Sequence, residues 1–413
     1  MAEINEGELV SSGALPPEDF NNDIERICEI AEYDLLFDTE KFQSALSNTL
    51  NLSIDNDVIS SIVAAIQTGN IVLQGPPGTG KSSLARAIAE AFNVSTTMVT
   101  AHDDWTTYDV IGRLELQLTE DQKEQVAPVN GCFTQTVINC ANKIVQNFDD
   151  PAKPQAEWLI IDELNRAHLD KAFGELFTEL GTDDLVPVNL PHQPEGNRRL
   201  VIPRRFRLIA TLNSYDRQFV NNLSQAIRRR FTFITIDIPP RKPDSTSWSV
   251  DHNSTIGSIR ELTAIVDKAS SKVARRLTTL DPDLFSEKKS ELFEQLSSTY
   301  FGTIQKLMDL ISSIRYSTTT DTPYLPIGTA QLIDTVELFL VQLLQCENIT
   351  ESTINKAMDW ATSVKIVPLF EADAIDHETI FSLAENLQVP FNKKTKRELL
   401  TIANAGLVFT PVD

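Results

Sequence analysis

The residues best suited to chemistry form a glycine-rich run that fits the pattern G-x-x-x-x-G-K-[ST]. The run comprises Gly75, Pro76, Pro77, Gly78, Thr79, Gly80, Lys81 and Ser82, with Ser83 directly after it. Glycines allow the backbone turns that point successive N–H groups at phosphate oxygens, and a helix that begins there adds its positive N-terminal end. Lys81 can neutralise terminal phosphates, and the Ser82 hydroxyl can bind Mg²⁺. The run predicts a loop that binds a nucleotide and Mg²⁺, with a chance glycine-rich turn as the alternative.

Two adjacent acids, Asp162 and Glu163, end an apolar run at residues 158–161. Ligands of open parallel sheets bind at the carboxyl ends of the strands, so we expect Asp162 beside the phosphate loop, where it can hold Mg²⁺ directly or through water. Glu163 can polarise the attacking water, a role that contributes about 10²–10⁴-fold. The alternative is an acidic strand end that caps the next helix, and the phosphate loop upstream favours the catalytic interpretation.

Apolar runs typical of strands alternate with amphipathic runs typical of helices across the first half of the chain. We expect strands at residues 71–73, 96–99, 158–161, 206–211 and 231–238, and helices at 55–65, 83–92 and 133–145. Apolar strands separated by helices imply a parallel sheet covered on both faces. The expected fold class is α/β, a P-loop NTPase αβα core followed by helices.

The domain organisation follows from shifts in composition and periodicity. We expect an acidic helical lead-in at residues 1–50, the nucleotide-binding core at 51–240, a Ser- and Thr-rich linker at 241–258, and an all-helical lid domain at 259–413. Within the lid domain, helical periodicity predicts helices at residues 259–277, 284–314, 330–344 and 354–364.

The composition restricts the classes of partner. A net charge of −22 argues against a surface whose main task is to neutralise nucleic-acid phosphates, although a small basic channel inside an acidic ring is compatible with it. Four dispersed cysteines and five scattered histidines suggest neither a disulfide framework nor a zinc site. The acidic N-terminus is not typical of a signal peptide, and the apolar stretch at residues 336–344 is too short to span a bilayer. We therefore expect a cytoplasmic protein with no membrane contact.

Further blocks extend the pattern of the phosphate loop and the two acids. Residues 162–177 read DELNRAHLDKAFGELF, residues 206–217 read FRLIATLNSYDR, and residues 226–231 read AIRRRF. These blocks resemble the dynein-related branch of AAA+ ATPases, which includes MoxR-type chaperones and the motor subunit of McrBC-type restriction systems. The last two blocks are most similar to the restriction motors.

The resemblance implies roles for three more side chains. Asn213 would be the first sensor, whose amide can donate one hydrogen bond and accept another and so order the attacking water. Arg229 and Arg230 would be arginine fingers that reach the site of a neighbouring subunit, with Arg228 able to share the role. Such a finger contributes about 10³–10⁵ in rate. The alternative for these arginines is a basic helix end stabilised by the helix dipole.

The sequence departs from the family in two places. Residues 326–330, where a second sensor Arg is often found in the lid, contain no Arg. Restriction motors also carry a DNA-reading domain ahead of the core, whereas here the corresponding residues 1–50 are a short acidic stretch, so we expect target recognition to come from elsewhere. The sequence does not identify the base: ATP is expected from the superfamily, and GTP, which restriction motors prefer, stays open.

Residues 183–203 contain two apolar or alternating arms joined by a turn-rich stretch, a pattern that predicts a hairpin. In the family that the chain resembles, a hairpin at this place faces the pore of the ring. Arg198 and Arg199 would then form a positive collar for a polyanion or an acidic peptide. The alternative is that they pair with acids of an adjacent subunit and hold the ring together.

Together these patterns predict a nucleoside triphosphatase that assembles into a ring, expected to be a hexamer, with Mg-nucleotide at the subunit interfaces. Hydrolysis would remodel or translocate a macromolecular partner, in a restriction or defence-type system with a separately encoded effector. Nucleic acid would be contacted only through the pore or the partner. The rival interpretations are a MoxR-like protein-remodelling chaperone and a nucleotide-gated assembly switch. The combination of Lys81, Asp162, Glu163 and two candidate fingers argues against the switch.

Overall fold

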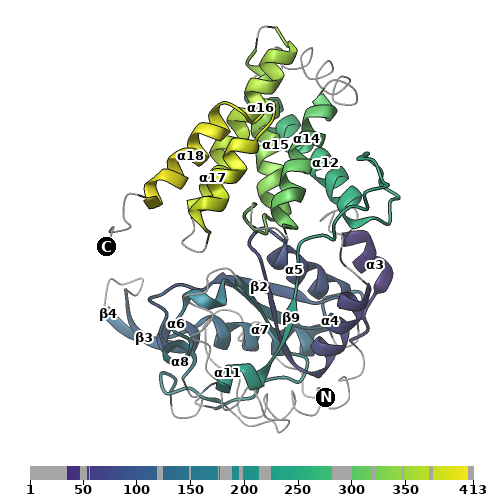
Figure 1. Cartoon of the computed structure of the whole chain (residues 1–413). Helices are drawn as coiled ribbons and strands as arrows, with labels where there is room; N and C mark the ends of the chain where they lie inside the picture. The colour runs from purple at the N-terminus through teal and green to yellow at the C-terminus, as the bar shows by residue number, and fades with distance from the viewer. Residues whose placement is uncertain are drawn as a thin grey trace. The chain divides into compact units, whose positions relative to one another are not determined.

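The described part of the chain falls into two compact units, drawn in Figure 1. The first ends at Ile236, and the second begins at Asp237 and also takes in residues 76–80. The computed structural model describes residues 35–46, 54, 56–118, 124–147, 150–174, 176, 188–194, 199–213, 225–280, 300–317, 322–346, 348–371 and 375–407. Within those ranges no helix is both long enough and apolar enough to cross a bilayer.

The first unit is built on a five-stranded sheet in which every neighbouring pair of strands is parallel. In spatial order, the strands are β2 (Ser95–Thr100), β5 (Glu157–Asp162), β8 (Leu208–Asn213), β1 (Asn70–Gly75) and β9 (Phe231–Thr235). The side chains of β5 and β8 are buried on both faces except at the last residue of each strand. A continuous apolar strand of this kind requires helices above and below it. The predicted α/β architecture is confirmed.

Helices cover both faces of this sheet. α4 (Asn56–Thr68) leads into β1, α5 (Lys81–Ala91) follows β1, and α7 (Cys132–Asn147) precedes β5. The chain crosses the sheet from β1 to β2 and then returns through β5 and β8, so right-handed crossovers require α5 and α7 to lie on opposite faces. Figure 1 shows this arrangement. The central strands β5 and β8 are therefore shielded from water except at their last residues, whereas the edge strands β2 and β9 are partly exposed.

A short N-terminal helix, α3 (Thr39–Ser44), packs against the end of α5. Asp38 caps this helix by accepting the Lys41 N–H at 2.9 Å, and its own N–H donates to the Ala91 carbonyl at 2.9 Å. The Phe37 ring lies 5.1 Å, between centroids, from the ring of Phe92. The last residues before the core are thus part of its packing.

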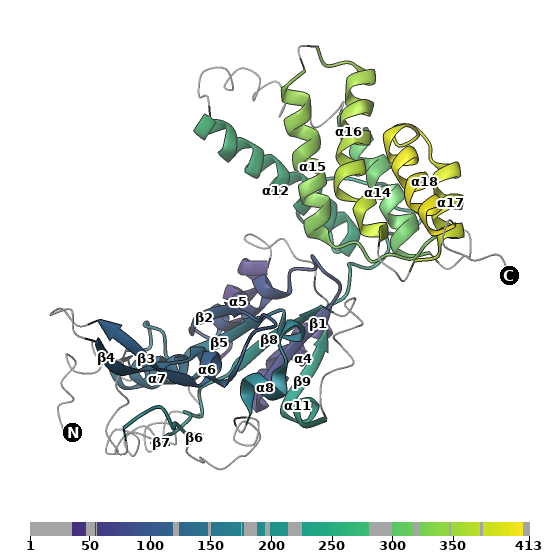
Figure 2. The same ribbon diagram turned by 90° about the vertical axis from the view of Figure 1, so that its left-hand side faces the viewer.

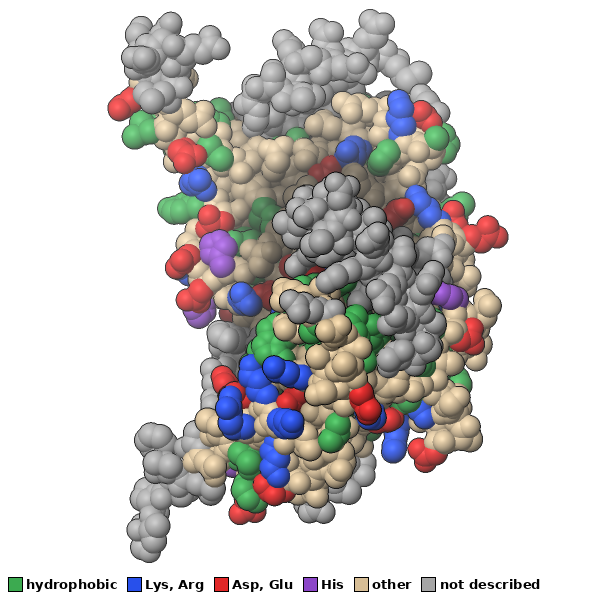
Figure 3. Space-filling view, turned by 90° about the horizontal axis from the view of Figure 1, so that it is seen from above, with side chains coloured by type: hydrophobic (Ala, Val, Ile, Leu, Met, Phe, Trp, Pro, Cys, Tyr) green, Lys and Arg blue, Asp and Glu red, His purple; other side chains and the backbone are tan. Residues whose placement is uncertain are grey.

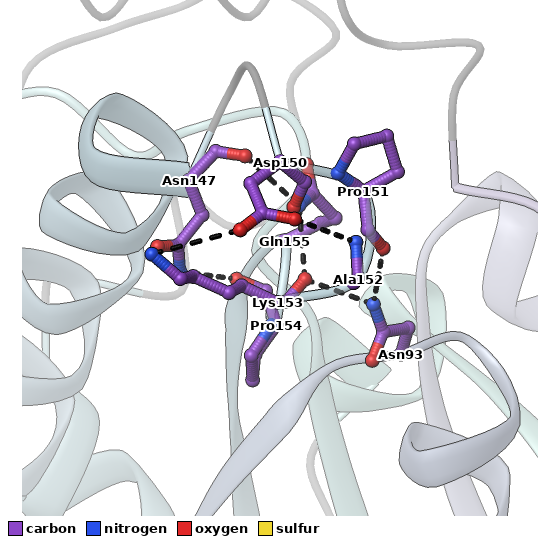
Figure 4. A network of polar contacts seen from close by, with 8 residues as sticks. All are labelled: Asn93, Asn147, Asp150, Pro151, Ala152, Lys153, Pro154 and Gln155. Carbon is purple, nitrogen blue, oxygen red and sulfur yellow. Dashed lines mark hydrogen bonds and ion pairs between the residues drawn. The ribbon is translucent and has the colours of Figure 1, made fainter.

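A network of polar contacts fixes the turn between α7 and β5 (Figure 4). The Asn93 amide donates to the carbonyls of Pro151 and Lys153, at 2.9 and 2.8 Å. From the other side, the Gln155 amide donates to the carbonyls of Asn147 and Asp150, at 3.0 and 2.8 Å. Two side chains therefore satisfy carbonyls that no helix or strand pairs, which fixes where β5 begins.

The first unit also contains a hairpin that the sequence analysis did not predict. β3 (Gly112–Leu118) and β4 (Glu124–Asn130) pair antiparallel, and Figure 2 shows them extending away from the five-stranded sheet. Leu114, Leu116 and Val126 share one face of the hairpin and remain exposed. β3 alternates polar and apolar residues, as a strand does, whereas β4 contains Pro128 and has no clear alternation, so the sequence signal for the hairpin is incomplete.

The second unit is helical. It comprises α12 (Gly257–Leu280), α14 (Phe301–Arg315), α15 (Thr329–Leu344), α16 (Glu351–Lys365), the short η6 (Val367–Glu371), α17 (His377–Asn386) and α18 (Lys394–Leu407). α15 lies beside α16 within the unit (Figure 2). Residues 241–256 contain no helix or strand, yet Trp248 packs on the helical core and donates its indole N–H to Asp309 at 2.7 Å. Residues 281–299 lie outside the described ranges, so the N-terminal half of the predicted helix at 284–314 is not described.

A buried ion pair lies inside the helical unit. The Arg315 guanidinium donates two hydrogen bonds to the Glu261 carboxylate, both at 2.8 Å, and one to the Ile327 carbonyl at 2.6 Å. Thr329, the first residue of α15, donates to the same carboxylate at 2.7 Å. Both charged side chains are almost completely buried, so each depends on the other to offset the loss of solvation. The pair joins α12, α14 and the start of α15.

We expect Glu261→Gln to lower the free energy of unfolding by about 3–5 kcal/mol, because it leaves the Arg315 charge buried without an anionic partner. Glu398→Gln is the matched control, because the Arg397–Glu398 pair is exposed and such pairs contribute about 0–1 kcal/mol. Chemical denaturation followed by tryptophan fluorescence measures both. Equal losses of unfolding free energy in the two variants would show that the buried pair contributes no more to stability than the exposed pair.

Candidate active site

The predicted phosphate loop joins the end of β1 to the start of α5. Gly78 and Gly80 have φ angles of +76° and +85°, which only glycine adopts without strain. A Cβ at Gly75 would overlap the carbonyl oxygen of Ile236, so this position requires glycine for a different reason, close backbone approach. Thr79 donates its hydroxyl to the Pro76 carbonyl at 3.0 Å and closes the turn. The loop therefore has the backbone turns that a phosphate cradle needs.

Lys81 is the first residue of α5 and is buried, with 8% of its surface exposed. Its Nζ donates to the carbonyl of Gly75 at 3.0 Å, across the base of the loop. A buried ammonium needs anionic or polar partners because burial removes its hydration. A phosphate held by the loop would supply such a partner, so the surroundings of Lys81 fit a phosphorylated ligand.

Three oxygen-bearing side chains converge where β5 ends. Asp162 Oδ1 accepts the Ser82 hydroxyl at 2.6 Å and the Thr211 hydroxyl at 2.5 Å. Ser82 comes from α5 and Thr211 from β8, so the carboxylate links two elements that flank β5. Carboxylate and hydroxyl oxygens are hard ligands of the kind that Mg²⁺ prefers. The donor set that the sequence predicted for a metal, Ser82 and Asp162, is thus brought together and fits that ion.

Thr211 is a site residue that the sequence analysis missed. Besides donating to Asp162, its Oγ1 accepts the backbone N–H of Glu163 at 3.0 Å. Thr211 is 2% exposed and lies in an otherwise apolar stretch of β8, two residues before Asn213. A lone hydroxyl in such a strand, just ahead of the candidate sensor, is the signal that could have identified it.

Glu163 lies immediately after β5 with a left-handed backbone, φ 55° and ψ 46°. For a non-glycine residue this conformation costs on the order of 1–3 kcal/mol, and such residues cluster at functional sites. The turn takes the Glu163 side chain out of the strand direction and leads into the short helix η3 (Leu164–Arg166). Its carboxylate forms an ion pair with Arg166.

The candidate sensor, Asn213, is the last residue of β8, and its Cα pairs with that of Gly75 in the register of β1 and β8. Its backbone N–H donates to Asn165 Oδ1 at 3.3 Å. The structure therefore brings Gly75, Asp162, Glu163 and Asn213 to the same edge of the sheet, as the parallel topology requires.

The candidate arginine fingers do not lie at the carboxyl ends of the strands, where the phosphate loop is. Arg229 and Arg230 end α11 (Gln225–Arg230), which runs directly into β9. Phe231 pairs with Asn70, the first residue of β1, so these arginines lie at the amino ends of the strands. Five residues of strand rise by about 15 Å, and this is roughly the separation from the edge that carries Gly75 and Asp162. Within one subunit, the structure does not bring the arginines to the site.

The predicted hairpin at residues 183–203 is described in part. β6 (Val188–Asn189) pairs antiparallel with β7 (Arg199–Leu200), whereas Arg198 falls outside the described ranges. After β6, the buried His192 and Gln193 contact the Asn130 amide oxygen, at 3.2 and 2.9 Å from its Oδ1. Burial lowers the pKa of His192, which favours the neutral imidazole that this contact accommodates. The connection between β6 and β7 is thus joined to the last residue of β4.

A parallel sheet of this order, a glycine loop between a strand and a helix, and an acid pair two strands away define a P-loop nucleoside triphosphatase. Residues 70–231 match the AAA domain of the dynein-related subfamily. The chain accordingly contains an AAA domain of the dynein-related subfamily, and the resemblance to that branch drawn from its motifs is confirmed.

One relative is similar over a longer stretch. The chain is 27% identical, over 273 residues, to the Type IV methyl-directed restriction enzyme EcoKMcrB subunit of Escherichia coli (strain K12). The similarity covers 61% of this chain and 56% of that relative. The chain therefore spans little more than half the length of the restriction subunit.

We expect Thr211→Val to reduce ATP hydrolysis about tenfold or more, because it keeps the shape of the side chain and removes the hydroxyl that holds Asp162 and Glu163. A hydrogen bond to a charged group contributes about 1.5–3 kcal/mol, and about 1.4 kcal/mol corresponds to a factor of ten. Thr211→Ser keeps the hydroxyl and should retain most of the activity. Steady-state hydrolysis with a thermal-unfolding control tests this, and equal activity in the Val and Ser variants would contradict it.

Proposed function

We propose that this chain is the motor subunit of a ring, expected to be a hexamer, that binds Mg-ATP between subunits and uses its hydrolysis to remodel or translocate a macromolecular partner. The observation that supports this most directly is the gathering of Lys81, Ser82, Asp162 and Asn213 at one edge of the sheet, with the candidate fingers at the other edge. A site divided in this way needs a second copy of the chain to be complete.

In this proposal, each residue of the edge has its own task. The backbone of residues 75–83 binds the phosphates, and Lys81 neutralises the terminal ones. Ser82 and Asp162 hold Mg²⁺, which would supply charge stabilisation for the phosphate oxygens. Glu163 takes a proton from the attacking water while Asn213 orders that water. The oxygen of the water then forms a bond to the terminal phosphorus, and the bond to the leaving diphosphate breaks.

The proposed chemistry requires Glu163 to change its partner. In this structure its carboxylate is paired with Arg166 three residues along, so that guanidinium occupies the position that a water would need. We infer that assembly and nucleotide binding release Glu163 toward the water. Arg229 and Arg230, supplied by the adjacent subunit, would then stabilise the charge on the transferred phosphoryl group.

The proposal for the partner rests on the similarity to a subunit of a methyl-directed restriction enzyme. We propose that this chain likewise serves a restriction or defence-type system with a separately encoded effector in the cytoplasm, and that nucleic acid is contacted only through the effector or the pore. The net charge of −22 supports an indirect contact. On the face that Figure 3 shows, acidic side chains are scattered widely while basic ones gather mainly in one group.

The match to the dynein-related subfamily is equally compatible with a MoxR-like chaperone that remodels a protein. Capture with Glu163→Gln separates the two, because a ring that binds nucleotide without turning it over should stay on its partner. Recovery of a nuclease supports the restriction motor, and recovery of a protein substrate without one supports the chaperone. ATP is proposed as the nucleotide, with GTP tested in the same assays.

We expect Lys81→Ala to abolish nucleotide binding, because the buried ammonium is lost, and Glu163→Gln to keep binding and lose turnover, because only the base is lost. Binding of a fluorescent ATP analogue and steady-state hydrolysis, measured side by side, distinguish the two. The removal of Glu163 should reduce turnover about 10²–10⁴-fold. Full turnover in Glu163→Gln would contradict the assignment of the base.

We also expect a mixture of Arg229→Ala and Lys81→Ala proteins to recover part of the activity that each lacks alone. In the mixed ring, an interface that combines the intact site of the Arg229→Ala subunit with the intact Arg229 of the Lys81→Ala subunit is complete. Hydrolysis measured over a series of mixing ratios tests this, with light scattering as the control for assembly. A mixture as inactive as its components, with rings present, would mean that the fingers do not act between subunits.

A further inference from the structure

The short helix η3 that follows the two acids carries a residue with no role so far, Asn165. It is buried, with 5% of its surface exposed, although an asparagine in a surface turn normally faces water. Asn165 lies two residues after Glu163 and one residue before Arg166, at the carboxyl end of β5. Its position is therefore on the edge of the sheet that carries the candidate site.

The two ends of the Asn165 carboxamide have different surroundings. Its Oδ1 accepts the backbone N–H of Asn213 at 3.3 Å, so this contact ties the turn after β5 to the end of β8. The same contact fixes which way the amide faces, since only the oxygen can accept. Its Nδ2 is buried and has no hydrogen-bond partner among the described residues.

A buried donor without a partner is uncommon, because it loses water without gaining a replacement. This donor belongs to a side chain whose other end is hydrogen-bonded to the candidate sensor, and Glu163 with its strained backbone is two residues away. A missing acceptor at such a place is most simply an oxygen that arrives with the ligand. The edge already holds Lys81 and the Ser82–Asp162 pair, which fit the phosphates and their Mg²⁺.

We propose that Asn165 is a second carboxamide of the active site, and that its Nδ2 donates to an oxygen of the terminal phosphate while its Oδ1 holds the sensor strand in place. This inference rests on the proposed site for Mg-ATP. It adds a preference for one nucleotide. A nucleoside diphosphate lacks the terminal phosphate oxygen that accepts from Nδ2, so Asn165 favours binding of the triphosphate over the diphosphate. Loss of the terminal phosphate would also affect the end of β8, since Oδ1 of the same carboxamide accepts the backbone N–H of Asn213.

The test compares affinities for a non-hydrolysable ATP analogue and for ADP. Asn165→Asp keeps an acceptor for the Asn213 N–H and replaces the donor with an anionic oxygen. We expect its affinity for the ATP analogue to fall about tenfold or more, the range of a hydrogen bond to a charged group, with ADP affinity within about twofold of wild type. Asn404→Asp, on the exposed face of α18, is the matched control and should change neither affinity.

Hydrogen exchange separates the two ends of the amide. Peptides that contain Asn213 should exchange faster in Asn165→Ala, which removes the acceptor, and at the wild-type rate in Asn165→Asp. If Asn165→Asp does not fold, Asn165→Ala removes the same donor without adding a buried charge, and the same loss of ATP-analogue affinity is expected from it.

The outcomes are distinguishable from a failure of the proposed site. Wild-type protein that binds neither nucleotide would overturn the site itself. Wild-type protein that binds both, together with folded Asn165 variants whose ratio of ATP-analogue to ADP affinity is unchanged, would overturn the inference about Asn165 alone. An equal loss of both affinities would also overturn it, because it would mean that Asn165 only maintains the shape of the loop.

Discussion

The site depends on one carboxylate oxygen. Asp162 Oδ1 accepts hydroxyls from Ser82 and Thr211 and so links the helix after the phosphate loop to β8 across the end of β5. Two hydrogen bonds to a single charged atom define its position more narrowly than either does alone. The left-handed turn at Glu163 is tied to the same cluster through Thr211. Asp162, Glu163 and the helix that follows the phosphate loop are therefore held by one cluster of hydrogen bonds.

The order of the strands separates the candidate site from the candidate arginine fingers. Parallel strands bring every carboxyl end to one edge, where the loop, the acids and Asn213 meet. The same rule sends the residues just before β9, including Arg229 and Arg230, to the other edge. No rotation of an arginine side chain covers the length of a strand. The topology that gathers the candidate site thus separates it from Arg229 and Arg230 of the same chain, which is why the proposal assigns the fingers to a neighbouring copy.

Prediction from the sequence succeeded where chemistry and fold are written in the same short run. The phosphate loop and Asp162 were predicted, because glycines, lysine and acids follow apolar strands there. Thr211 and Asn165 were missed, because they act through contacts between residues 49 and 48 positions apart along the chain. The β3–β4 hairpin was missed because β4 contains Pro128 and lacks the alternation that β3 has. The roles given to the phosphate loop, Asp162, Glu163, Asn213 and the arginines stay predictions.

The position of β1 also has a consequence for how the protein is made. β1 lies between β8 and β9, so its first hydrogen-bonding neighbour is complete only at Asn213 and its second only at Thr235. Pairings between segments this distant in sequence form slowly, because a long loop must close first. On the ribosome, β2 can pair with β5 well before β1 finds a partner. The phosphate loop therefore matures last, after most of the unit that surrounds it has been made.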